Sequence, residues 1–311
     1  MPIDVSIVIP IFDEEESIHP LCSSIRQEMA TAGLDYEVIL VDDGSRDRTF
    51  EMARAEADED HRVRVVKLNR NFGQTAALKA GFEQVRGTIT VTMDGDLQND
   101  PSDIPMMVAK IGEGFDMVVG WREHRKDPLV SRRIPSRVAN WMIRRVAGTT
   151  IKDNGCAIRA YRSSLLKELP LYSEMHRLLP TMLAMTGARI AEVPVAHHER
   201  RFGHSKYGLA RTYKVILDMI AVKAILTFHR SPLFGLGWPA ILFGVLAILF
   251  VILGIWAIIE NPEWIVLVYP GVAVLFAFLC ISFLTLGILC ELIYLTGDEK
   301  VTRIPTIQDE R

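Results

Sequence analysis

Two aspartates separated by one glycine, Asp94-Gly95-Asp96, are the residues whose types and spacing point most directly to chemistry. They follow an apolar run typical of a buried strand, and Gln98 stands two residues further on. Carboxylate and amide oxygens are hard ligands that suit Mg²⁺ or Mn²⁺, cations that often also bind substrate phosphates. The pattern predicts a metal site made by Asp94, Asp96 and Gln98, in which the cation would neutralise charge on a departing diphosphate.

Two further acidic clusters follow earlier apolar runs. One occupies 13–15, after Pro10, and the other lies within 42–47. Asp, Gly and Ser also dominate turns and helix N-caps, and for Ser45 and Asp47 a capping role is the better interpretation. Because ligands bind beyond the carboxyl ends of parallel strands, three acidic clusters after three strands favour one common site.

Basic residues gather in two later stretches, one after the fifth expected strand and one before the apolar C-terminal part. Their members are Arg122, Arg125, Lys126, Arg132, Arg133, Arg137, Arg144, Arg145, Arg200, Arg201 and Lys206. These residues could bind a phosphate, but attraction to anionic lipid explains most of them, at about 1 kcal/mol per basic residue near a membrane. We prefer that second interpretation for Arg144 and Arg145.

The elements that must position these residues alternate along the first 120 residues. We expect strands at Val5–Ile9, Glu37–Asp42, Val63–Leu68, Thr88–Met93 and Met117–Val119. We expect helices around Ile18–Ala32, Arg48–Glu59, Ala76–Val85 and Ile104–Gly112. This β-α-β-α order predicts an α/β fold with a mostly parallel sheet covered by helices.

The C-terminal third is apolar. Leu233–Ile259 and Trp264–Cys290 contain no charged residue, and each exceeds the roughly 20 residues needed to cross a bilayer as a helix. Basic residues flank the pair of segments but are absent from the link at 260–263. The positive-inside rule then predicts two transmembrane helices with both termini in the cytoplasm. Two buried core helices are the less favoured alternative.

Whole-chain properties narrow the class of protein. The 311 residues carry a net charge of −3, which argues against a nucleic-acid-binding protein. The four cysteines show no CxxC pair or metal-ligand spacing, so a disulfide framework is not expected. Asp4 precedes the first apolar run and no basic segment does, so the N-terminus does not resemble a signal peptide. We expect the soluble part to remain in the cytoplasm.

An ordered set of motifs resembles the inverting family 2 glycosyltransferases, and more narrowly the branch of dolichyl-phosphate mannose synthase and bacterial polyprenyl-phosphate glycosyltransferases. The motifs are Pro10 with Asp13-Glu14-Glu15, Val41-Asp42-Asp43-Gly44-Ser45 with Asp47 and Thr49, Asn69-Arg70-Asn71-Phe72-Gly73, Asp94-Gly95-Asp96-Leu97-Gln98 with Asp100-Pro101, and Arg201-Phe202-Gly203-His204-Ser205-Lys206-Tyr207. The resemblance covers almost the whole chain. One departure is Asp13, where the family usually has Asn, and either side chain accepts a hydrogen bond.

The resemblance implies a GT-A fold, which is a Rossmann-like domain that holds a nucleoside diphosphate sugar. It implies that base and ribose contact Pro10, Asp13, Glu15, Asp42 and Arg70, whereas Asp94, Asp96 and Gln98 hold the metal and diphosphate. For the lipid phosphate it implies Arg122, Arg132, Ser136 and Lys206, with Arg133 as a register alternative to Arg132. Asp43 would orient its own loop.

A lipid monophosphate, with a second pKa of about 6, is mostly dianionic at neutral pH and needs little help from a base. Asp153 is the best candidate for a base or an acceptor-orienting carboxylate, and a purely turn-forming role is equally well supported. We therefore expect an inverting, metal-dependent transfer to a polyprenyl phosphate such as undecaprenyl or dolichyl phosphate. A processive polysaccharide synthase and a catalytically silent, membrane-tethered nucleotide-sugar sensor are the alternatives.

We expect the following organisation: a GT-A domain at 1–207, a juxtamembrane segment at 208–230, the two transmembrane helices within 231–295 and a cytoplasmic tail at 296–311. The segment 208–230 mixes charged and apolar residues. This mixture suits an amphipathic helix on the membrane, and an ordinary surface helix fits it nearly as well. The expected location is the inner (plasma) membrane as a multi-pass protein, and relatives make a homo-oligomer a reasonable expectation.

Overall fold

A computed structural model describes residues 3–122, 151–166, 171, 175–185, 187–199, 232–260 and 268–296. The described residues up to 199 form one compact unit, and the two C-terminal helices form another. The predicted domain boundaries at 207 and 230 lie outside the described residues. Each unit is considered by itself below.

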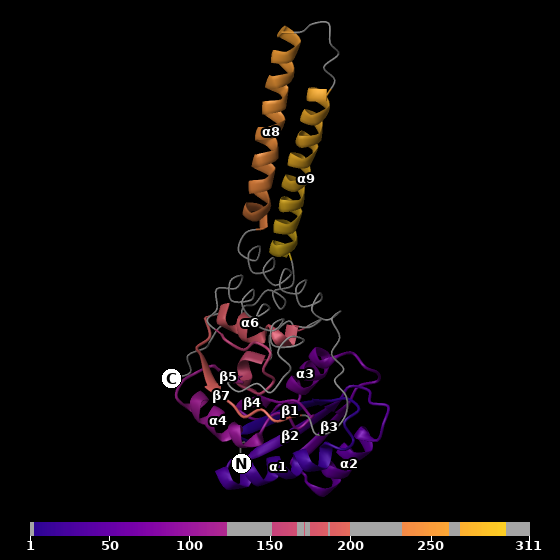
Figure 1. Cartoon of the computed structure of the whole chain (residues 1–311), viewed down its shortest axis with the longest axis vertical. Coiled ribbons are helices and arrows are strands. Elements are labelled where there is room, and N and C mark those ends of the chain that lie inside the picture. The colour runs from indigo at the N-terminus through magenta and orange to yellow at the C-terminus, as the bar shows by residue number, and fades with distance from the viewer. Residues whose placement is uncertain are drawn as a thin grey trace. The chain divides into compact units, whose positions relative to one another are not determined.

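The first unit is built on a seven-stranded sheet with the order β3-β2-β1-β4-β6-β5-β7 (Figure 1). The strands are β1 (Val5–Ile11), β2 (Tyr36–Asp42), β3 (Val63–Lys67), β4 (Ile89–Thr92), β5 (Met117–Trp121), β6 (Arg159–Arg162) and β7 (Ile190–Pro194). All neighbouring pairs are parallel except the two that β6 makes with β4 and β5. The prediction of a mostly parallel α/β sheet is therefore confirmed.

The helices of this unit are α1 (Ile18–Ala32), α2 (Thr49–Glu59), α3 (Gln74–Phe82), α4 (Ile104–Gly112) and the shorter α6 (Leu179–Met185). Alternate residues of the buried strands face different helices. Ile7 and Ile9 pack in one core with α1 and α4. Val8 faces α3 instead, so closely that a Cβ on Gly81 would lie 2.3 Å from Val8 Cγ1. The sheet is therefore covered on both faces.

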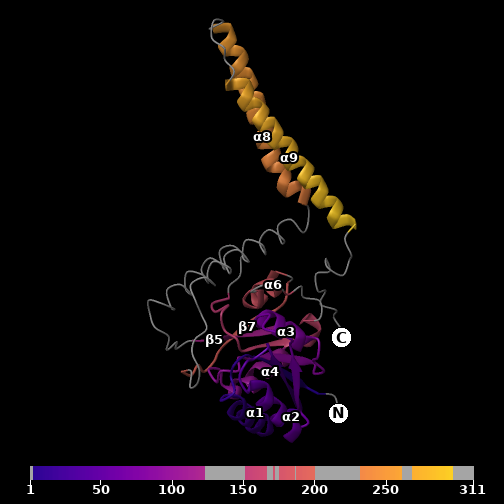
Figure 2. The ribbon, with the colours of Figure 1, turned by 90° about the vertical axis from the view of Figure 1, so that its right-hand side faces the viewer.

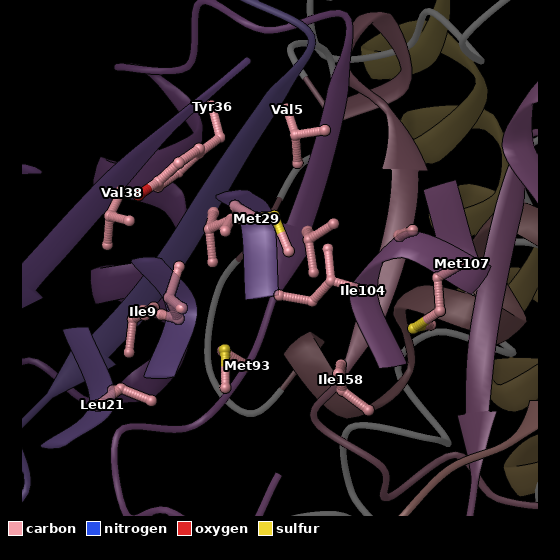
Figure 3. Packing of buried hydrophobic residues seen from close by; sticks show 14 of the residues in the cluster. Val5, Ile9, Leu21, Met29, Tyr36, Val38, Met93, Ile104, Met107 and Ile158 are labelled. Carbon is pink, nitrogen blue, oxygen red and sulfur yellow. The ribbon is translucent and has the colours of Figure 1, made fainter. Parts of the chain in front are cut away.

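The core between the sheet and helices α1 and α4 reaches the residue that precedes the acidic pair. Met93 is 1% exposed and belongs to the same cluster as Ile9, Leu21 and Ile104 (Figure 3). Burying side chains of this size removes about 1.5–3 kcal/mol of unfavourable hydration each. The strand that leads into Asp94 is thus fixed by packing, so the backbone of the acidic pair starts from a rigid position.

Antiparallel strand β6 brings a later part of the chain to the carboxyl edge. It begins beside the end of β4, since Thr92 pairs with Arg159, and beside β5, since Val119 also pairs with Arg159. Residues 153–158, which lead into β6, therefore lie at the edge where β4 and β5 end. This arrangement was not predicted from the sequence, and it places Asp153 beside the expected site.

The second unit is a helical hairpin of α8 (Pro232–Glu260) and α9 (Val268–Thr296), whose helices run side by side (Figures 1 and 2). Both are long and apolar enough to cross a membrane, judged by length and composition, and 11% of each apolar window is buried. Such exposure favours membrane spans over the alternative of two buried core helices. The start of the second predicted segment, Trp264, lies outside the described residues.

Close contacts hold α8 against α9. The ring of Phe243 lies 6.0 Å from that of Phe276 and 5.5 Å from that of Phe283, measured between centroids. Near the start of α8, the Leu233 backbone N–H donates to Glu291 Oε2 over 3.1 Å. This bond satisfies an N–H at the first turn of α8, which has no partner within its own helix.

Candidate functional site

The carboxyl edge of the sheet collects the acidic clusters as predicted. Strands β1 and β2 are parallel and pair Ile11 with Asp42, so residues 12–15 and 42–47 continue from the same edge. Strand β4, parallel to β1, ends at Thr92, two residues before Asp94. Three segments distant in the sequence therefore meet at one edge.

Asp94 is held at both its backbone and its side chain. Its N–H donates to Asn99 Oδ1 over 3.1 Å, and Gln74 Nε2 donates to Asp94 Oδ1 over 2.8 Å. Asp96 is 5% exposed and accepts the Gln98 backbone N–H over 3.2 Å. The two carboxylates are thus fixed by contacts from the loop itself and from helix α3.

Electrostatics at Asp94 favour a cation. Burial raises the pKa of the Asp94 carboxyl, and the neighbouring Asp96 charge raises that pKa further. The guanidinium groups of Arg122, Arg159 and Arg177 act in the opposite direction. Two neighbouring like charges repel, and a divalent cation between them would relieve that repulsion. The pair, with hard oxygen donors, fits Mg²⁺ or Mn²⁺.

Gln98 shares no strand face with Asp94 and Asp96, because all three residues follow the end of β4. Strand β4 ends at Thr92, and Leu97 adopts φ +61°, which turns the chain between Asp96 and Gln98. Gln98 instead contacts a later segment: its carbonyl accepts the His198 N–H over 2.9 Å. Within the described ranges, no group of three or more His, Cys, Asp or Glu could hold a metal. Gln98, a substrate or water could supply further ligands.

Asp13 and Glu15 contact the second acidic loop. Asp13 adopts φ +51°, and its Oδ1 accepts the Arg46 N–H over 2.8 Å. Glu15 Oε2 accepts the Arg48 N–H over 2.9 Å. Asp47 accepts the Thr49 N–H over 3.0 Å at the start of α2, in agreement with the capping interpretation. These side chains join the two loops.

Asp42 is fully buried, and only one of its carboxylate oxygens is engaged. Oδ1 accepts the Ser45 N–H over 3.0 Å, whereas Oδ2 has no hydrogen-bond partner among the described residues. A buried acceptor without a partner is costly, so this oxygen suits a donor from a bound ligand. Pro10 lies nearby on β1, paired with Val41.

Asp43 organises the neighbouring loop. Its carboxylate oxygens accept the N–H groups of Phe72 and Gly73 over 2.7 and 2.9 Å. A Cβ on Gly44 would lie 2.5 Å from the Arg70 carbonyl carbon, so the two loops pack backbone to backbone. Arg70 is exposed, and its guanidinium lies 4.7 Å from the centroid of the Phe72 ring. The loop thus presents a cation and an aromatic side chain to solvent.

Arg122 and Asp153 form a buried, two-bond ion pair. Arg122 Nε donates to Asp153 Oδ2 over 2.8 Å and Nη2 donates to Oδ1 over 2.9 Å. Their side chains are 12% and 5% exposed. Asp153 also accepts the Gly155 N–H over 3.1 Å. The sequence identified both residues as candidates but did not predict that they bind each other.

Sequence reasoning missed Gln74 and Arg159. Arg159 is 4% exposed and donates to three backbone carbonyl oxygens, those of Cys156, His176 and Asn154. These contacts arise from strand β6, whose Arg-Ala-Tyr-Arg sequence carries no apolar run that would mark a strand. Arg132, Ser136 and Lys206, with Arg133 and Arg144, lie outside the described residues.

The four cysteines are free thiols. Cys156 lies beside the ion pair, and burial raises the pKa of its thiol to about 11. The thiol therefore stays protonated at neutral pH and serves as a packed small side chain.

Comparison with known proteins identifies relatives of the whole chain. The model of the family described as "Glycosyl transferase family 2" matches residues 6–170. Dodecaprenyl-phosphate galacturonate synthase of Rhizobium johnstonii is 41% identical over 296 residues, covering 94% of this chain and 88% of that protein. Undecaprenyl-phosphate 4-deoxy-4-formamido-L-arabinose transferase of Shewanella sediminis is 39% identical over 291 residues, covering 93% and 86%.

Solved structures share the fold of the first unit. Glucosyl-3-phosphoglycerate synthase from Mycobacterium tuberculosis, in complex with Mn²⁺, uridine diphosphate and glucosyl-3-phosphoglycerate, matches with a TM-score of 0.55 and 23% identity, covering 71% of this chain and 78% of that one. TarS of Staphylococcus aureus, in complex with UDP-GlcNAc, matches with a TM-score of 0.51 and 20% identity, covering 72% and 67%. The predicted GT-A fold is confirmed.

Proposed function

The chain belongs to glycosyl transferase family 2, and from this premise we propose that it transfers a sugar from a nucleoside diphosphate sugar to the phosphate of a polyprenyl lipid. The observation that carries the proposal is the pair of Asp94 and Asp96 at the carboxyl edge, where Asp96 is buried and three arginine charges act on Asp94. The acceptor follows from the relatives, which bear the names of polyprenyl-phosphate sugar transferases and match the chain along almost its whole length.

The donor would occupy the edge between β2 and β4. We assign base and ribose contacts to Pro10, Asp13, Glu15, Asp42 and Arg70. The unpartnered Asp42 Oδ2 supports a contact with a ring or hydroxyl donor of the nucleoside. Arg70 lies in the loop whose Phe72 N–H donates to Asp43. From this position the Arg70 side chain would cover the base.

Asp94 and Asp96, with Gln98, would hold Mg²⁺ or Mn²⁺. When bound, the cation supplies charge that stabilises the diphosphate as it leaves the sugar. The chain's own contribution is to fix both carboxylates and to keep Arg122, Arg159 and Arg177 close enough to act on Asp94. A preorganised charge pattern of this kind stabilises the transition state without reorganisation during the reaction.

The acceptor phosphate would bind Arg122, Arg132, Ser136 and Lys206. As a dianion it can attack the anomeric carbon itself, which inverts that centre, so positioning matters more than proton removal. Asp153 binds Arg122 through both carboxylate oxygens. This contact supports a role in orienting Arg122 toward the acceptor in preference to a role as a base.

The hairpin of α8 and α9 would anchor the enzyme in the plasma membrane as a two-span protein. Both termini and the catalytic unit would then face the cytoplasm, with the link near Asn261 outside, because basic residues flank the spans and are absent from 260–263. We also propose that the protein forms a homo-oligomer.

A mass-spectrometric transfer assay tests the proposal. The purified full-length protein is incubated with undecaprenyl phosphate, Mn²⁺ and a panel of nucleoside diphosphate sugars. We expect one new lipid, heavier than the acceptor by a single glycosyl unit, with a β linkage where the donor is α-linked. A ladder of longer products would support a processive synthase. Donor binding without turnover on any lipid phosphate would support the catalytically silent sensor, and either result would overturn the proposal.

A further inference from the structure

We propose that Gln74 is a positioning residue that orients Asp94 for the metal ion, a role that rests on the proposed function. Gln74 is the first residue of helix α3, an element outside the acidic loop. Among the described residues, it supplies the one side-chain hydrogen bond to the Asp94 carboxylate, from Gln74 Nε2 to Asp94 Oδ1 over 2.8 Å.

The contact restricts a ligand that is otherwise free to rotate. A carboxylate turns readily about its terminal torsion. With Oδ1 engaged by Gln74, and the Asp94 backbone held by Asn99 Oδ1 over 3.1 Å, the second oxygen is left to coordinate a cation. Groups that hydrogen-bond to metal ligands orient them, and replacing such groups typically lowers metal affinity 10- to 100-fold.

Gln74 is itself fixed on both sides. The preceding Gly73 adopts φ +95° and donates its N–H to Asp43 Oδ2 over 2.9 Å. The following Thr75 hydroxyl hydrogen-bonds with His176 Nδ1 over 2.7 Å, and both of those side chains are buried. The first turn of α3 is thus tied to the β2 loop and to the segment before α6. The backbone of Gln74 therefore has a fixed position from which its side chain reaches Asp94.

This placement connects the two halves of the donor site. Asp43 holds the backbone at Phe72 and Gly73, and the next residue, Gln74, holds Asp94. Three consecutive residues therefore join the loop assigned to the base with the loop assigned to the metal. A change at Gln74 should act on metal binding first and on nucleotide binding only when the metal is present.

The test measures Mn²⁺ binding directly, from the electron paramagnetic resonance signal of free Mn²⁺. Wild type, Gln74→Met and Gln74→Asn are titrated as full-length protein, with and without UDP. Methionine removes the donor, whereas asparagine keeps the amide on a shorter side chain. Gln27→Met, on the exposed face of α1, is the matched control. Thermal unfolding of each variant is recorded in parallel.

We expect at least about tenfold weaker Mn²⁺ binding for both Gln74 variants, with unfolding temperatures and metal-free UDP binding close to those of wild type and of the control. Unchanged Mn²⁺ affinity in both variants would overturn the role of Gln74 while leaving the metal site intact. A purely structural role is indicated instead if affinity falls only in proportion to the unfolding temperature. Failure of wild type to bind Mn²⁺ in either condition would overturn the proposed metal site, and the role of Gln74 with it.

Discussion

Arg122 and Asp153 belong to the acceptor side of the proposed site, and their mutual contact constrains what each can do. Both are largely buried and joined by two hydrogen bonds. Arg122 also acts on the charge of Asp94. An arginine whose guanidinium is held in this way has a fixed orientation, which suits the recognition of a phosphate.

Breaking this pair should destabilise the first unit. Asp153→Ala removes this carboxylate from a largely buried guanidinium, and losses of about 3–5 kcal/mol are usual for such changes. Arg122→Ala should cost a similar amount, and the double variant should cost clearly less than the sum of the two. Chemical unfolding of the four proteins checks this, and additive effects would show that the pair contributes no coupling.

Asp103 gives a pH-dependent contribution to stability. Burial raises the pKa of its carboxyl from 3.8 to about 6, although Oδ2 accepts the Ala196 N–H over 2.9 Å. The folded state therefore disfavours the ionised form, so this contribution favours folding below pH 3.8 and is lost as the pH rises to about 6.

Asp103→Asn, which cannot ionise, should raise the unfolding temperature at about pH 7.5. The gain over wild type should shrink at about pH 5, where much of the wild-type carboxyl is already protonated. Thermal unfolding at both pH values checks this. An equal gain at both would assign the stabilisation to packing or hydrogen bonding.

A substitution at Lys206 tests whether this residue binds the acceptor phosphate or only attracts the protein to the membrane. If it contacts the acceptor phosphate, Lys206→Ala should lower kcat/KM for the lipid at least about tenfold, as expected for loss of a charge-assisted bond of about 1.5–3 kcal/mol. Donor affinity should change much less. Arg144→Ala, a surface charge in our interpretation, is the control. Equal small effects of both variants, abolished by added anionic lipid, would contradict this contact.

At the scale of elements, the first four β-α units could be predicted because each carries its own signal. Ile18–Ala32 and Ile104–Gly112 form helices with the predicted bounds, and the first ends at Gly33, which adopts φ +64°. Strand β6 could not be predicted, because Arg159–Arg162 becomes a strand through its pairing with β4 and β5.

In the site, too, only the features with a local sequence signal could be predicted. Acidic residues that follow strands were recognisable from the sequence, since topology alone brings them to one edge. The contacts of Asp94 with Gln74 and of Arg122 with Asp153 join residues 20 and 31 positions apart. Such contacts depend on how loops fold over the edge, which no local pattern encodes.

The hairpin of α8 and α9 leads to a prediction about membrane topology. With both termini in the cytoplasm, a cysteine introduced at Asn261 should react with an impermeant thiol reagent added to intact cells, because the link between the spans would lie outside. A cysteine introduced at Gln308 should react only after the cells are opened. The reverse pattern of labelling would contradict the proposed orientation.

At the scale of the whole molecule, a soluble donor and a membrane-bound acceptor must reach one enzyme. The chain combines a GT-A unit with two apolar helices, and the matches to the two relatives span 94% and 93% of the chain. A water-soluble nucleotide sugar can bind the sheet edge from solution, whereas a polyprenyl chain stays in lipid. The anchor would keep the catalytic unit at the surface where the lipid phosphate emerges.

The most direct test of this account is the yield of glycosylated undecaprenyl phosphate made by wild type and by Asp96→Asn in the presence of Mn²⁺ or excess EDTA. An amide oxygen is a weaker ligand than a carboxylate and removes one charge from the site. We therefore predict that wild type with Mn²⁺ forms the lipid product, whereas the variant and the chelated enzyme lose nearly all activity while unfolding at an unchanged temperature. Full product formation by Asp96→Asn, or by wild type in EDTA, would contradict a metal-dependent transfer at the acidic pair.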